Sequence, residues 1–146
     1  MAVTTSVYNA YKADLSTATN AWTVATVNCA LFSASTFTAA DAAYNTSGTE
    51  VASANGYTTG GGAVGTRTVS GTTSRAFKIT GAFGGGAAGT TTWTSTGAGF
   101  SAVAAKLYVP ASSPIAHVDF GGTFTASGGG TFVITWDATN GAINLA

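Results

Sequence analysis

The sequence predicts an all-β fold: a single antiparallel β-sandwich or barrel-like domain that begins with a short N-terminal helix or arm. Two observations carry this prediction. Six or seven short segments have the two-residue alternation of strands, and turn-forming residues separate them, while no segment has the pattern of a long helix. The 146 residues are enough for one hydrophobic core, so we expect one domain over 1–146, with an arm at 1–21 and a β core at 22–146.

The N-terminal arm has apolar residues at helical spacing. Val7, Tyr8, Tyr11 and Leu15 follow one another as on one face of a helix, which predicts a short amphipathic helix over 6–15. A helix of about ten residues is marginal by itself and has to pack on something. Because an arm can dock on a neighbour, Val7, Tyr8 and Tyr11 are the candidate subunit contacts.

The first half of the core is expected to contain a strand over 23–32, in which Val27, Cys29 and Leu31 share one face. One or two helical turns, or an ordered loop, are expected in the alanine-rich stretch that follows and ends near Gly48. Three more strands are expected: a polar strand around 63–70, a strand at 75–80 and a strand near Trp93. A mobile excursion is expected around 84–89, before the last of these strands.

The last third has the clearest alternation. Residues 100–109 and 114–121 read as two strands joined by the turn "PASSP", which predicts a β-hairpin. A second hairpin is predicted over 130–145, where Phe132, Ile134 and Trp136 share one face before an Asp-Ala-Thr-Asn-Gly turn.

The chain is unusually poor in charge. Only 7% of its residues are charged and its net charge is zero, which argues against binding to nucleic acid or to an anionic membrane surface. No secretory signal or apolar run of membrane-spanning length is visible. A surface of hydroxyls, small residues and backbone loses little hydration energy on burial and suits a subunit held against neighbours. A secreted β-domain of the same composition is the alternative.

Two groups of glycines have the spacing of the G-x-G-x-x-G phosphate-binding motif, without its sequence context. Gly60, Gly62 and Gly65 spell G-x-G-x-x-G, but a strand-like segment follows where a helix is needed. No acidic residue occurs between Glu50 and Asp119 to hold a ribose. We therefore expect no nucleotide cofactor and assign these glycines to backbone geometry. Gly84, Gly86 and Gly89 repeat the pattern equally by chance.

One group of ionisable residues is a candidate for chemistry. His117 and Asp119 lie two apart on a strand, so they share a face, and Lys106 on the paired strand of the hairpin could neighbour them. A histidine beside a carboxylate can begin a base or zinc site, but further ligands are not apparent. The preferred interpretation is a polar cluster on the outer face or at a subunit contact. No catalytic residue or metal ligand is assigned, and Cys29 is expected to be buried.

Four segments, in order, resemble small virion proteins of tailed bacteriophages. They are "WTVATVNCALFSAS" (22–35), "EVASANGYTTGGGAVGTRTV" (50–69), "FSAVAAKLYVPASSPIAHVDFGG" (100–122) and "GGTFVITWDATNGAINL" (129–145). The resemblance implies a β-rich subunit that decorates or joins parts of the particle, with no catalytic residues to carry over. The chain departs from that family at His117, where an aromatic residue is usual, and in its glycine-rich middle at 70–99.

The function expected from this resemblance is that of a capsid decoration, or cement, protein in the virion, assembled in the host cytoplasm. It would bind the major capsid protein, as a homo-oligomer and most simply a trimer, and would have no enzymatic activity. The first alternative is a tail, neck or fibre-base component, with neighbouring tail or neck proteins as partners. A second alternative, a surface carbohydrate-binding module, depends on exposed aromatic residues such as Tyr57 and Trp93.

Overall fold

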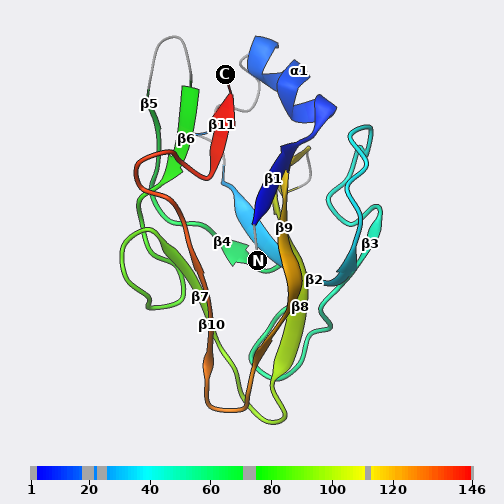
Figure 1. Ribbon diagram of the computed structural model, residues 1–146, viewed down its shortest axis with the longest axis vertical. Coiled ribbons are helices and arrows are strands. Elements are labelled where there is room, and N and C mark those ends of the chain that lie inside the picture. The colour runs from blue at the N-terminus through cyan, green and yellow to red at the C-terminus, as the bar shows by residue number, and fades with distance from the viewer. Residues whose placement is uncertain (1–2, 18–21, 23–25, 71–74, 111–112, 146) are drawn as a thin grey trace.

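The chain is built from antiparallel β-sheets with one short helix near its N-terminus (Figure 1). The computed structural model describes residues 3–17, 22, 26–70, 75–110 and 113–145. In that part of the chain most strands are short, as the turn spacing predicts, the strand Pro114–Ala126 with its 13 residues being an exception, and the sheets pack around a common apolar core. The prediction of an all-β, sandwich-like domain is therefore confirmed.

The described residues form three sheets. The largest has the strand order β1 (Thr4–Val7), β9 (Pro114–Ala126), β8 (Phe100–Tyr108), β2 (Asn28–Ser35) and β3 (Gly48–Glu50), and β4 (Gly62–Ala63) also pairs with β2. A two-stranded sheet joins β10 (Thr131–Thr135) to β7 (Thr90–Thr94), and a three-stranded sheet has the order β11 (Ile143–Leu145), β6 (Arg75–Ile79) and β5 (Arg67–Ser70).

The β8–β9 hairpin is the centre of the largest sheet and confirms the clearest sequence prediction. Its register places Leu107 opposite Ala116 and Lys106 opposite His117, with a bulge between Ala102 and Ala104. The alternation alone suggests one covered face, but Lys106 and Tyr108 on the other face are also buried. The segment between β2 and β3 covers that second face at these two residues: the Lys106 Nζ donates to the carbonyls of Thr46 and Ser47, and the Tyr108 ring stacks on Tyr44.

The N-terminal segment differs from the predicted helix over 6–15. Residues Thr4–Val7 form a strand that pairs antiparallel with β9, and the helix α1 spans Asn9–Thr17. The β-branched threonines and valine favour the strand, and the free edge of β9 supplies its partner. Tyr8 and Tyr11, at the start of the helix, are fully buried within the chain itself.

Three other expectations are refined or corrected. The strand predicted over 23–32 is β2, shifted towards the C-terminus, and residues 23–25 lie outside the described part of the chain. Of the two alternatives for the alanine-rich stretch before Gly48, helical turns or an ordered loop, the structure has the loop, which is made of turns and bends. The polar segment predicted as one strand over 63–70 is divided between β4 and β5, which belong to different sheets.

The second predicted hairpin is wrong in its pairing. β10 pairs with β7, whereas β11 pairs with β6, so the two strands lie in separate sheets. The connection crosses between the sheets: the Trp136 amide donates to the Gly89 carbonyl, and the Ala142 amide donates to the Phe77 carbonyl. The turn that the sequence shows at Asp137–Gly141 exists, but it redirects the chain instead of closing a hairpin.

Candidate functional site

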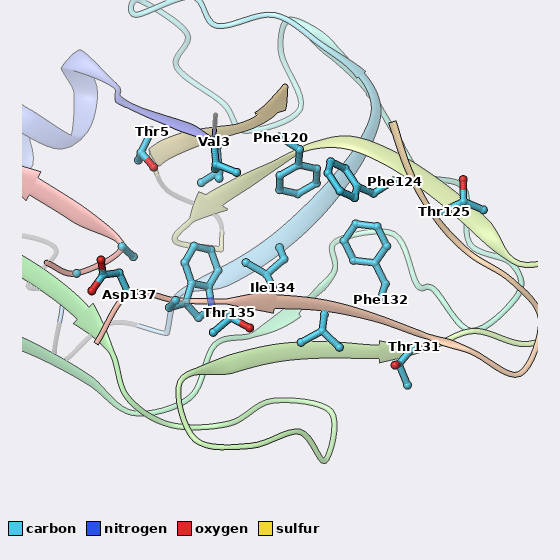
Figure 2. Close-up of a pocket in the computed structure, with 15 residues that line it drawn as sticks. Val3, Thr5, Phe120, Phe124, Thr125, Thr131, Phe132, Ile134, Thr135 and Asp137 are labelled. Atoms are coloured by element: carbon cyan, nitrogen blue, oxygen red, sulfur yellow. The ribbon is translucent and has the colours of Figure 1, made fainter. Parts of the chain in front are cut away.

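An apolar groove of about 690 Å³ opens between the β1–β9 side of the largest sheet and β10 (Figure 2). Phe120, Phe132 and Trp136 are buried and form its inner surface. In Figure 2, Phe120 and Phe124 reach in from β9 while Phe132 and Ile134 approach from β10. A volume of this size is in the range of protein binding sites, and aromatic lining is typical of them.

The rim of the groove is exposed and apolar. Val3, Phe124 and Val133 are 60%, 45% and 49% exposed and all line the groove. The two other exposed large hydrophobic side chains in the described part of the chain, Phe37 and Val69, are less open, at 37% and 39%. Exposed apolar residues scattered singly are normal on protein surfaces, but a contiguous group marks a contact site.

Ring contacts and one buried hydrogen bond hold the groove in shape. The ring of Phe120 lies 6.0 Å from Phe124, edge to face, and 6.0 Å from Phe132. The Trp136 indole Nε1 donates to the Thr91 Oγ1 at 2.8 Å, which fixes the orientation of that ring at the end of the groove. Because these side chains are already packed, a partner would meet a formed surface.

The groove has one ionisable side chain in its lining, Asp137. Its Oδ1 accepts hydrogen bonds from the Thr139 and Asn140 amides, at 2.7 and 2.8 Å, and its Oδ2 accepts from the Asn140 Nδ2. These bonds, first those to Asn140, lower the pKa of the carboxyl group. Since the hydrogen-bonding capacity of this carboxylate is used within its own turn, the groove offers apolar contact rather than proton transfer or ion binding.

The polar cluster predicted from His117, Asp119 and Lys106 is assembled only in part. Lys106 and His117 are cross-strand neighbours, as expected, but both are buried instead of lying on an outer face. Asp119 is exposed and accepts a hydrogen bond from the Gly121 amide. The two basic residues are therefore covered, and the carboxylate faces outward.

The covering segment runs from residue 36 to residue 47 and is attached to the two basic residues. The Lys106 Nζ donates to the carbonyls of Thr46 and Ser47, and it lies 4.7 Å from the centre of the Phe32 ring. The His117 Nε2 is 3.1 Å from the Ser35 Oγ, and the Phe37 ring lies 6.0 Å from the imidazole. These contacts give the cluster a structural task, which is to hold the segment against β8 and β9.

The surroundings of His117 favour the neutral form of its imidazole. Burial lowers the pKa of His117, the neighbouring Lys106 lowers it further, and Asp119 opposes both. Burial also lowers the pKa of Lys106, against the attraction of Asp41. Within the covering segment, the Asp41 Oδ2 is buried without a hydrogen-bond partner, and so is the hydroxyl of Tyr8, whose ring packs on Phe37 of that segment. No group of three or more metal-binding side chains occurs in the described ranges.

The glycine run at 60–65 acts on the backbone. Gly60 and Gly61 have φ values of 93° and 63°, in the left-handed region that favours glycine. A Cβ on Gly61 would lie 1.8 Å from the Cys29 carbonyl oxygen, so the chain passes β2 at a distance that only glycine permits. The Gly60 amide also donates to Glu50 Oε1, which accepts the Tyr57 hydroxyl as well.

The candidate subunit contacts are placed differently from the expectation. Tyr8 and Tyr11 are buried in their own chain, where their rings lie 5.1 Å from Phe37 and 6.2 Å from Phe77. Burial raises the pKa of Tyr11 to about 12. Val7 is half-buried and packs against the core. The two tyrosines therefore stabilise the chain itself, and the exposed apolar surface lies at the groove.

Sequence reasoning missed the rim of the groove. One signal was present: Val133 falls on the face opposite Phe132 and Ile134, where a half-buried strand normally has a polar residue.

Comparison with models of protein families, with curated proteins and with solved structures finds no match to this chain. No helix in the described ranges is long and apolar enough to cross a membrane.

Proposed function

We propose that this chain is a structural subunit of a tailed-bacteriophage virion, a decoration or cement protein that binds the major capsid protein on the assembled head. The observation that carries the proposal is the combination of a chain with 7% charged residues and a preformed groove whose rim is apolar and exposed. Such a surface is suited to permanent contact with other subunits, because covering it removes few ions from water.

The mechanism would be mass action on a repeated lattice. A subunit that bridges neighbouring capsid proteins binds the assembled head and not the separated subunits, so its binding free energy stabilises the head. Many symmetry-related contacts add up even when each is weak. In this proposal the protein works as a homo-oligomer, most simply a trimer, in the virion after assembly in the host cytoplasm, and it performs no catalysis.

The second candidate is a tail, neck or fibre-base component, which would use the same surface to join a ring of subunits. The carbohydrate-binding alternative loses the two residues named for it, because Tyr57 and Trp93 are both buried in the core. Neither ring is available to stack on a sugar at the surface.

Copy number in purified particles tests the proposal and separates the two virion roles. Quantitative mass spectrometry against the major capsid protein should find hundreds of copies per particle, a number set by the head lattice. A few dozen copies or fewer would point to the neck or tail, and absence from the particle would overturn both. A cryo-electron microscopy map of the same particles should place the density on the outer face of the head.

A further inference from the structure

The groove lies between two outermost strands. β1 is the last strand of the largest sheet and β10 belongs to a two-stranded sheet, so each has one edge without a partner among the described strands. Residues of β1, β9 and β10 together line the space between these edges (Figure 2). Unpaired edges present backbone N–H and C=O groups that can add a further strand.

These two edges lack the features that usually prevent such pairing. Proteins commonly protect an edge with charged side chains or proline. The strands Thr4–Val7 and Thr131–Thr135 contain neither. The exposed residues of the rim, Val3, Phe124 and Val133, add an apolar surface beside the open edges.

The absence of charge indicates what kind of surface fits the groove. Asp137 is the one ionisable residue of the lining and its carboxylate is engaged in its own turn. A charged partner would therefore lose hydration without finding an opposite charge. A second copy offers the matching chemistry, because its own β1 and β10 edges are equally uncharged and apolar.

We propose that this groove rim, made by Val3, Phe124 and Val133 with the open edges of β1 and β10, is the surface by which one copy of this chain binds a second copy. The inference rests on the proposed role as an assembling subunit and names one partner for it. The contact buries the three apolar side chains and gives the strand edges backbone partners. If the same contact repeats head to tail and closes, it forms a ring such as the proposed trimer.

The test is sedimentation velocity of the purified full chain over a dilution series, with two rim variants and a matched control. Val133→Lys and Phe124→Lys each place a charge on the rim, at side chains that are about half exposed, and Val133→Lys does so without removing a ring contact of the groove. Val69→Lys is the control, because Val69 is 39% exposed on the outermost strand β5 and does not line the groove. Thermal melting confirms that each variant is folded.

The wild-type chain should sediment as a discrete oligomer, and each rim variant should weaken its association on the order of 100-fold, because the added charge is buried without a partner. Val69→Lys should leave the oligomer intact. A monomeric wild type, an undefined aggregate, or an oligomer insensitive to both rim variants would overturn the inference. Hydrogen exchange of the wild type gives a second readout, since the β10 amides should be protected more at high than at low protein concentration.

These results are separable from the test of the proposed function. A chain that self-associates through the rim but is absent from virions would contradict the virion role and leave this inference standing. If the chain is found in virions but is monomeric in solution at all concentrations, this inference is contradicted and the virion role stands.

Discussion

The hydrogen bond from Trp136 to Thr91 allows a sharp test of how the groove is held, because the next threonine supplies an opposite control. Thr91 is fully buried and its hydroxyl accepts from the Trp136 indole. Thr92 is also buried, on the other face of β7, but its hydroxyl has no partner. The substitutions Thr91→Val and Thr92→Val remove the same hydroxyl group at adjacent positions.

The two variants should change stability in opposite directions. Thr91→Val leaves a buried indole N–H unsatisfied, which costs about 1–3 kcal/mol. Thr92→Val removes a buried hydroxyl that had already lost its hydration without compensation, so it should be neutral or stabilising by up to about 1 kcal/mol. In a domain of this size each kcal/mol shifts the melting temperature by roughly 2–4 °C.

Thermal and urea unfolding of both variants measure the difference, and a double-mutant cycle with Trp136→Phe isolates the bond. The coupling energy between Thr91→Val and Trp136→Phe should be about 1 kcal/mol or more, because each single change removes the same interaction. Equal loss of stability in both valine variants, or a coupling energy near zero, would refute the assignment of this bond as what orients Trp136 at the groove.

Two further predictions concern the covered cluster and the glycine run. Because the pKa of His117 is lowered in the folded chain, the unfolded chain binds more protons as the pH falls through about 6.5. Stability should therefore decrease between about pH 7 and 5, and His117→Phe should flatten this dependence in urea unfolding; an unchanged slope would contradict it. The substitution Gly61→Ala should be far more destabilising than Gly85→Ala, judged by melting temperature. Both residues have positive φ, which costs about 1–2 kcal/mol for alanine, but only at Gly61 does the new Cβ also collide with the backbone of β2, and Gly85 has no atom within 4 Å. Similar losses in the two variants would show that the close approach is not what requires glycine.

Local alternation determined much of the β structure. The hairpin of β8 and β9 follows from two alternating segments and a proline-containing turn, since side-chain period and turn length together fix which residues face each other. For the same reason the sequence predicted that Lys106 could neighbour His117 and Asp119 across the hairpin, and the structure places Lys106 directly opposite His117. The glycines of the 60–65 run were also assigned correctly to backbone geometry, because the helix that a phosphate site requires is missing from the pattern.

Only the tertiary structure decided which segment covers each face of the sheets and which strands are hydrogen-bonded to each other. The 36–47 segment buries Lys106 and His117, and no local pattern reveals a cover that comes from a distant part of the chain. β10 and β11 read as a hairpin, yet they pair with β7 and β6, because non-local partners compete with the nearest strand. The helical spacing of Tyr8 and Tyr11 is compatible with packing on a neighbouring subunit and with packing on the chain's own core. Which of the two occurs depends on tertiary packing, and in the structure both residues are buried in their own chain. The groove exists for the same reason: it is the space left between two sheets. The residues of its rim come from β9, from β10 and from the segment just before β1, which the sequence could not place side by side.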